Sequence, residues 1–214
     1  VVGMAGKVSH NPPGWVDAAL EIFHERGISF IAGMALNRIP TLDATARRGP
    51  DRDGVIEGKP SVLQVHWNGD VSEMGRLMNT AHYDIMNPDV ERVLLGAVDE
   101  ILERYGDHPA FSGLSYWVQP RSSIWFGSLD CGYGDITIQR FTKDTGIAVP
   151  GAAPDPGRFI KRYDFLVRSS AKRREKWIAW RCEKVKELWM KIHRRLQAKS
   201  PRLTLTMNTW ALWK

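Results

Sequence analysis

Three short apolar runs, far apart in the chain and separated by helical patterns, constrain this fold most. They are ISFIAGMAL at 28–36, FSGLSYWV at 111–118 and RLTLTMNTW at 202–210. Each run has the length of a buried strand and is too short for an average helix. Apolar residues at helical spacing fill most of the chain between them. This alternation predicts parallel strands joined by right-handed helical crossovers.

The helical segments carry recognisable start and stop signals. The best marked begins after Asn87, a capping residue, has Pro88 at its first position and stops at Gly106. Further helices are expected at 14–26 and about 136–144, and helical segments are expected to continue to Lys199. Asp135 and Asp155 read as N-caps of the helices that follow them.

Loops that follow the strands are long, whereas those that precede them are short. This is the habit of a (β/α) barrel, whose site lies at the carboxyl ends of the strands. A complete barrel typically needs about 250 residues, and the 214 residues here hold only three strong strands. We therefore predict an α/β fold, a partial or incomplete (β/α)8 TIM-like barrel, with residues 1–214 as one barrel-type domain. We expect it to be a fragment of a longer chain.

Composition excludes several classes of protein. The chain is 43% hydrophobic and 25% charged, as in ordinary soluble globular proteins, and it has no apolar run of ~18 residues that could cross a membrane. It begins at Val1 without a Met, so a signal peptide removed earlier is compatible with it and secretion or a periplasmic location stays open. The oligomeric state is also open. We predict no metal and no cofactor, because the cysteines and histidines lack ligand spacing; the histidines considered are His66, His82 and His108. The stretch HYD, 82–84, is expected to be a solvent-facing loop, with a metal or catalytic role as the alternative.

The net charge of +6 raises the question of a nucleic-acid partner. Much of the charge lies between Lys161 and Lys199, where Ile178, Leu188 and Ile192 recur at helical spacing. This pattern favours a long amphipathic helix with a solvated basic face. Nucleic-acid binding through that face is the disfavoured alternative, since no recognised binding motif accompanies it.

Side-chain parity places polar groups together at the strand ends. In the last run, Leu203, Leu205 and Met207 face one way and suit the helix layer, while Thr204, Thr206, Asn208 and Trp210 face the other. The same parity puts Asn37 at the end of the first run and Trp117 with Gln119 at the end of the second. Aromatic rings stack on the apolar faces of sugars, and amides bond to hydroxyls. The three amides with Trp117 and Trp210 therefore predict a carbohydrate site, with core packing as the alternative for both tryptophans.

The loop after the second run adds further candidates to this site. It contains Arg121, Trp125, Asp130 and Tyr133. Asp130 has no helix-capping role, so it is the carboxylate we predict to be catalytic. The predicted substrate-binding residues are Asn37, Trp117, Gln119, Arg121, Trp125, Tyr133, Asn208 and Trp210.

The order and spacing of several segments resemble a known group of enzymes. HPAFSGLSYWV, CGYGDITIQRFTKDTGIAVPG, DPGRFIKRYDFL and WIAWRCEKVKELWMKIHRRLQAKSPRLTLTMNTW resemble the middle of TIM-barrel glycoside hydrolases. The nearest are family 10-like glycosyl hydrolases and, more distantly, family 42 β-galactosidases. The resemblance covers roughly residues 85–210 and implies a barrel that binds carbohydrate.

The resemblance also raises a difficulty about catalysis. In the family 42 enzymes the proton donor is a Glu that follows an Asn at the end of strand four. Strand four here ends SYWVQP, with Gln119 near that position, and an amide cannot deliver a proton. The strand-seven nucleophile would lie beyond Lys214. Our hypothesis is a glycoside-hydrolase-like protein that binds carbohydrate and hydrolyses it only if Asp130 has a partner; the alternative is a non-catalytic carbohydrate-binding or scaffold module.

Overall fold

A computed structural model describes residues 14–34, 39–42, 55–56, 59–71, 73–74, 80–118, 125–153 and 155–208. The elements, in chain order, are α1 (Trp15–Glu25), β1 (Phe30–Met34), β2 (Val55–Ile56), β3 (Lys59–Pro60), β4 (Glu73–Met74), β5 (Thr80–Ala81), α3 (Pro88–Tyr105), β6 (Phe111–Trp117), α4 (Asp135–Thr145), α5 (Arg158–Tyr163), the π-helix η1 (Asp164–Arg168), α6 (Ala171–Lys199) and β7 (Thr204–Asn208).

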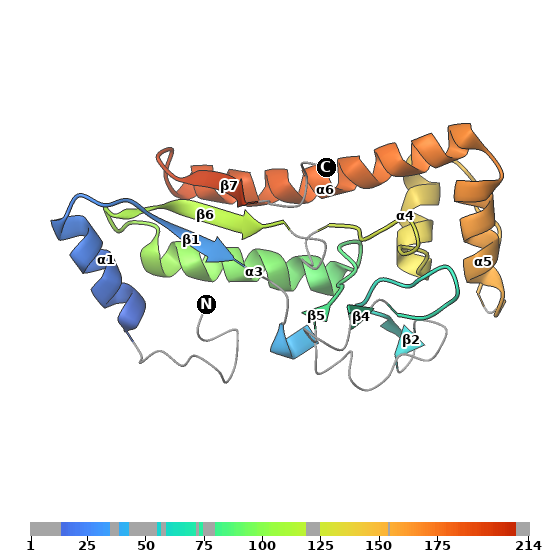
Figure 1. The fold of residues 1–214 in the computed structure, drawn as a ribbon, viewed down its shortest axis with the longest axis horizontal. Coiled ribbons are helices and arrows are strands. Elements are labelled where there is room, and N and C mark those ends of the chain that lie inside the picture. The colour runs from blue at the N-terminus through green and yellow to red at the C-terminus, as the bar shows by residue number, and fades with distance from the viewer. Residues whose placement is uncertain are drawn as a thin grey trace.

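A parallel three-stranded sheet of order β1-β6-β7 forms the centre of the fold (Figure 1). The β1–β6 pairing aligns Gly33 with Ser115, and the β6–β7 pairing aligns Trp117 with Asn208. All three strands come from the apolar runs, so the predicted parallel arrangement is confirmed. The pairs β2–β3 and β4–β5 are short antiparallel hairpins in the connection between β1 and α3.

Helices α3 and α6 cover one face of this sheet. They lie side by side, joined by ion pairs of 2.7 Å between Lys191 and Glu91 and 2.8 Å between Arg195 and Asp99. Beneath them Tyr116 is fully buried, with Trp189 edge-on to its ring at 5.4 Å. Side chains that point to this face are apolar because they form the core between the two layers.

Local signals explain where the two long helices begin. The side chain of Asn87 accepts a hydrogen bond of 2.9 Å from Asp89 N, which satisfies one of the free amides of α3. Ser170 does the same for α6, accepting from Arg173 N at 3.3 Å. The predicted start of α3 is confirmed, and the helical segments expected up to Lys199 resolve into α5, η1 and α6.

An aromatic cluster joins α4, α6 and the loop before α4, near the end of the molecule opposite α1 (Figure 1). Trp177 is fully buried at its centre. Its ring stacks on Trp180 at 5.3 Å and on Tyr133 at 6.1 Å, and meets Phe141 edge-on at 5.0 Å. Offset and edge-to-face pairs of this kind add stability beyond the area they bury.

One core prediction for β7 is wrong. Leu203 is fully buried and Leu205 packs against the core, as their parity requires. Met207 shares their side of the sheet but is 51% exposed. β7 is an edge strand of the described sheet, so it has a described neighbouring strand on one side alone. Within the described residues, no helix has the length and apolarity needed to span a membrane.

Candidate functional site

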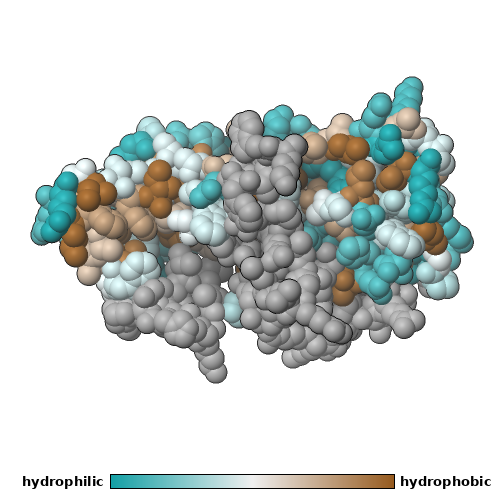
Figure 2. Space-filling model, in the orientation of Figure 1, coloured by the Kyte–Doolittle hydropathy of each residue, from teal (hydrophilic) through white to brown (hydrophobic). Residues whose placement is uncertain are grey.

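The face of the sheet opposite α3 and α6 has no described helix over it. The residues that point there are Ile31, Gly33, Ser115, Trp117, Thr204, Thr206 and Asn208. Ile31 is 40% exposed and Asn208 is also exposed. In Figure 2 apolar residues reach the surface over α1 and β1 among hydrophilic ones. This uncovered sheet face combines apolar surface with small polar side chains, which suits an amphipathic ligand.

Trp117 dominates the uncovered sheet face. Its side chain is 47% exposed at the carboxyl end of β6, beside Asn208 in the register. The indole lies above Gly33, since a β-carbon on that glycine would be 3.9 Å from Nε1 of Trp117. The structure therefore brings Trp117 and Asn208 together, and the alternative of core packing for Trp117 is wrong. An exposed indole beside an amide offers stacking and hydrogen bonding to one ligand.

Four predicted site residues lie outside the described residues. These are Asn37, Gln119, Arg121 and Trp210. Asn37 follows β1 and Trp210 follows β7, whereas Gln119 and Arg121 belong to the loop after β6. Their assignment to the site stays a prediction.

Tyr133 belongs to the core and is withdrawn from the site. It is fully buried between Tyr163 and Trp177, and its hydroxyl already donates to the carbonyl of Leu129. Burial raises the pKa of this phenol, so it stays neutral. A buried hydroxyl with its proton in use has nothing to offer a ligand.

Trp125 lies at a different place from the uncovered sheet face. It borders an apolar pocket of about 380 Å³ with Phe126 and Leu129 of its own loop and Ile178 and Val185 of α6. Its carbonyl accepts a hydrogen bond of 2.9 Å from the side chain of Gln64. Trp117 is not among the described residues that line this pocket.

Asp130 is exposed on the loop before α4. Its Oδ2 accepts a hydrogen bond of 3.1 Å from the hydroxyl of Ser128, and its carbonyl accepts one of 2.9 Å from the backbone of Trp67. These contacts tie Asp130 to the segment 61–71 rather than to the sheet. Its predicted catalytic role stays a prediction, without a second carboxyl in contact with it among the described residues.

The segment HYD differs from its predicted solvent-facing position. His82, Tyr83 and Asp84 are all buried. Asp84 accepts hydrogen bonds of 2.9 Å from Met86 N and 2.7 Å from the hydroxyl of Thr137. Burial raises the pKa of this carboxyl, although both hydrogen bonds act against the rise. Gln64 N donates to His82 O, Asp84 N donates to Val62 O, and Thr137 of α4 meets Asp84. Local sequence could not reveal these contacts.

Gln64 organises the same buried polar region. Its Nε2 donates to the carbonyls of Tyr83 and Trp125, and its Oε1 accepts from Gly127 N at 3.2 Å and from the thiol of Cys131 at 3.1 Å. All four hydrogen-bonding positions of the amide are thereby used. Gln64 therefore holds the segment 61–71 and the loop 125–131 together, which makes it a structural residue.

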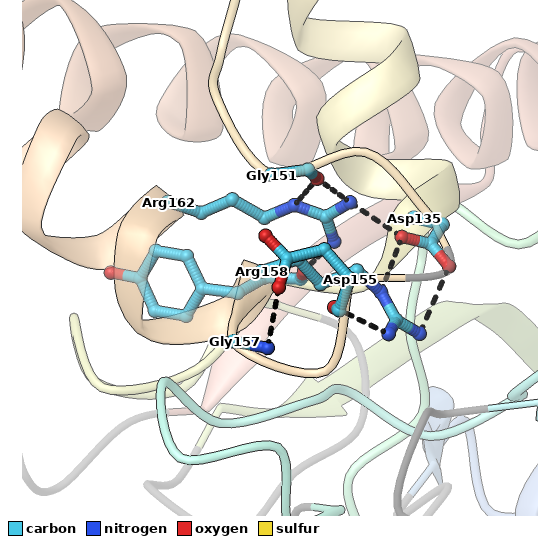
Figure 3. Close-up of polar contacts among 7 residues, drawn as sticks. Asp135, Gly151, Asp155, Gly157, Arg158 and Arg162 are labelled. Atoms are coloured by element: carbon cyan, nitrogen blue, oxygen red, sulfur yellow. Dashed lines mark hydrogen bonds and ion pairs between the residues drawn. The ribbon is translucent and has the colours of Figure 1, made fainter.

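Asp135 also differs from its predicted capping role. Helix α4 starts at Asp135 itself, and the carboxylate makes ion pairs with two buried arginines, 3.2 Å to Nε of Arg158 and 2.6 Å to Nη2 of Arg162 (Figure 3). Arg162 also donates to the carbonyl of Gly151 at 2.7 Å. Asp155 accepts from Gly157 N at 2.8 Å just before α5. The group fastens the segment 149–157 to α4 and is structural.

The basic face of α6 carries several ion pairs. The basic face of α6 is partly neutralised by acidic partners, including Asp144 for Lys184 and Asp107 for Lys199. Among the described residues, no three histidine, cysteine, aspartate or glutamate side chains are grouped to hold a metal ion. Cys131 and Cys182 are free thiols.

Comparison with known proteins shows what the fold is similar to. No family model matches the chain, and no curated protein does. Among solved structures it is similar to the β-galactosidase of Marinomonas ef1 (TM-score 0.62, 17% identity, 97% of this chain and 31% of that one). It is also similar to those of Bacillus circulans sp. alkalophilus (0.61, 15%, 99% and 31%) and Rahnella sp. R3 (0.59, 16%, 97% and 29%).

These similarities confirm the predicted fold class. The α/β fold with its parallel three-stranded sheet matches a fragment of the family 42 β-galactosidase TIM barrel, so the chain is a partial barrel in architecture. It spans about 30% of the length of the structures it matches. At this level of identity the likeness is one of fold.

Proposed function

We propose that this chain binds carbohydrate on the uncovered sheet face, with Trp117 as the stacking platform and Asn208 as a hydrogen-bonding partner. One observation carries the proposal: an indole that is 47% exposed stands at the carboxyl end of a parallel strand, on the face that no described helix covers. An exposed indole keeps apolar area in contact with water, which is unfavourable. A sugar stacked on the ring would remove that area from water.

The direction of the strands supports the same location. In parallel α/β folds, ligands bind beyond the carboxyl ends of the strands, where the following loops converge. Trp117 and Asn208 are the last residues of β6 and β7. Gln119, Arg121 and Trp210 follow these ends in the sequence, and Asn37 follows the end of β1; we keep all four as predicted partners.

Binding without hydrolysis is the form of the proposal that the residues support. Glycoside hydrolysis needs two carboxyl groups flanking the scissile bond, about 5–5.5 Å apart in retaining and about 6.5–9.5 Å apart in inverting enzymes. In the sequence, Gln119 is near the position that the resemblance assigns to the donor. The exposed carboxylate of Asp130 lies with Ser128 beside the segment 61–71. We therefore propose the non-catalytic carbohydrate-binding module over the hydrolase.

A binding assay with matched variants tests this proposal. Isothermal titration with lactose and with β-1,4-galacto-, cello- and xylo-oligosaccharides should find a glycan that the full chain binds. Trp117→Ala should lower that affinity about tenfold or more, as expected for loss of a stacking residue. Trp15→Ala, which removes a 39% exposed indole from α1, is the control and should bind like the wild type.

Two results would count against the proposal. Equal affinity of the wild type and the Trp117→Ala variant for every bound glycan would remove Trp117 from the site. Release of reducing sugar by the full chain, abolished in Asp130→Asn, would replace binding alone with hydrolysis and restore the catalytic role of Asp130.

A further inference from the structure

A second exposed indole, Trp67, stands at the tip of a turn far from the sheet in sequence. The turn spans 66–70: His66 N donates to Asp70 O at 2.7 Å, Gly69 N donates to His66 O at 3.0 Å, and Val65 bridges Val71. Gly69 has a φ of +89°, which favours glycine. The turn is therefore closed by its own backbone and holds Trp67 in a defined place.

The ring of Trp67 rests on a column of aromatic side chains. It stacks on Tyr163 at 6.0 Å, Tyr163 meets Tyr133 edge-on at 5.5 Å, and Tyr133 stacks on buried Trp177. The guanidinium of Arg168 lies 4.8 Å from the Tyr163 ring centre. One face of the indole meets Tyr163, and the residue is still 36% exposed. A platform supported in this way loses little freedom when a ligand binds.

Exposed polar side chains lie in the same turn as Trp67 and in the loop whose backbone is bonded to it. Asn68 Nδ2 donates to Asp70 Oδ2 at 2.7 Å, and Asp70 N donates to Asn68 Oδ1 at 3.1 Å, so each side chain fixes the other. Ser128 and Asp130 reach the same turn because Trp67 N donates to Asp130 O at 2.9 Å. Within the described part of the chain, Oδ1 of Asp70 and Oδ1 of Asp130 receive no donor. Each carboxylate can therefore accept a ligand hydroxyl.

This arrangement favours a sugar over a protein partner. A stable protein interface buries about 800 Å² on each side around an apolar centre. Here a single flat ring stands among exposed Asn68, Asp70, Ser128 and Asp130. A pyranose has one apolar face and a rim of hydroxyls, which matches an isolated ring with a polar border.

We infer that Trp67 forms a second carbohydrate subsite, separate from Trp117, and that the ligand is an extended oligosaccharide. The inference rests on the proposed function for the class of ligand, but it rests on different residues. Trp117 lies on the sheet, whereas Trp67 lies in a turn that is hydrogen-bonded to Asp130. No described contact joins the two indoles. A short sugar would occupy one platform, whereas a longer one would engage both and gain affinity.

Titration of the full chain with β-1,4-galactobiose and β-1,4-galactohexaose tests this inference. Trp67→Ala should lower the affinity for the hexaose about tenfold and leave the biose affinity at Trp117 unchanged. Trp15→Ala is again the matched control. Trp67→Phe should lower hexaose affinity about threefold, because the smaller ring keeps part of the stacking; it also decides the question if Trp67→Ala fails to fold.

The outcomes separate this inference from the proposed function. Hexaose affinity unchanged in Trp67→Ala and Trp67→Phe, but lost in Trp117→Ala, overturns the second subsite alone. If hexaose affinity falls in Trp67→Ala but not in Trp117→Ala, the site on the sheet is overturned and the subsite at Trp67 stands. A wild-type chain that binds none of these sugars, nor lactose, cello- or xylo-oligosaccharides, overturns both; binding of another glycan series with no effect of Trp67→Ala overturns the second subsite alone.

Discussion

Nη2 of Arg162 lies 2.6 Å from Oδ1 of Asp135, and this contact closes α5 onto the first turn of α4. The exposed fractions of the side chains are 4% for Arg162, 2% for Arg158 and 17% for Asp135, so two cations depend on one largely buried anion. Burial lowers the pKa of Arg162, and Asp135 opposes that shift. Removing one partner of a buried ion pair is destabilising, because it leaves a buried charge uncompensated.

Removing the anion from this group should therefore be costly. Asp135→Ala leaves Arg158 and Arg162 buried without their carboxylate and should lower the free energy of unfolding by about 3–5 kcal/mol. Urea denaturation followed by circular dichroism measures the change. Asp164→Ala breaks an exposed ion pair with Arg168 and should cost no more than about 1 kcal/mol. Equal losses of unfolding free energy in the two variants would show that the buried ion pairs contribute no more to stability than the exposed one.

Gly113 is required for the close approach of β6 and β7. It has a φ of +139°, and a β-carbon there would lie 2.0 Å from the carbonyl oxygen of Thr204. Gly113→Ala should destabilise the chain by roughly 3 kcal/mol or more through strain and strand separation. Gly27→Ala, at a φ of +65° but with open space around it, should cost about 1 kcal/mol. A thermal melt of the two variants that gave the same midpoint would contradict this.

Asp84 should make stability depend on pH. Its pKa is raised by burial, so the folded chain keeps this proton at pH values where the unfolded chain, with a carboxyl pKa of about 3.9, has lost it. The contribution of Asp84 to stability is therefore greatest below about pH 4 and falls as pH rises through the raised pKa. Asp84→Asn should remove that fall, while Asp89→Asn at the exposed start of α3 should keep it. Urea midpoints measured from pH 4 to pH 7 test this, and parallel curves for the wild type and Asp84→Asn would reject it.

The two thiols should differ in reactivity. Cys182 is exposed, whereas Cys131 is 1% exposed, hydrogen-bonded to Gln64 and raised in pKa by burial. A disulfide reagent such as DTNB should modify one thiol rapidly in the native chain and the second only in denaturant. Cys182→Ser should remove the fast phase. Rapid reaction of both thiols in the native wild-type chain would instead mean that the loop 127–131 opens readily.

Much of the fold was predictable because its signals are local. Strand length, helical spacing and the Asn87–Pro88 start signal depend on neighbours in the sequence, and β1, α3, β6 and β7 all appear where those patterns placed them. The alternation of elements also predicted the parallel sheet, since crossover geometry limits the choices. These features would hold for the segments in almost any surroundings.

The direction of candidate side chains was predictable only where parity along a strand decided it. Trp117 and Asn208 share one face because their strands align them, and the sequence of each strand is enough to infer it. Loop residues had no such guide. Tyr133 and Asp84 looked accessible, yet both are buried, and Trp67 was overlooked although it is exposed at a well-formed turn.

The sequence by itself determined the elements, their order and the side of each strand on which polar groups gather. Tertiary structure alone decided which of those groups meet solvent. Burial depends on what packs from distant parts of the chain: Trp177 from α6 covers Tyr133, and Thr137 from α4 meets Asp84 from the loop after β5. No local pattern encodes those encounters. The exposure of Trp117 and Trp67, on which both proposed carbohydrate contacts rest, is a property of the folded chain.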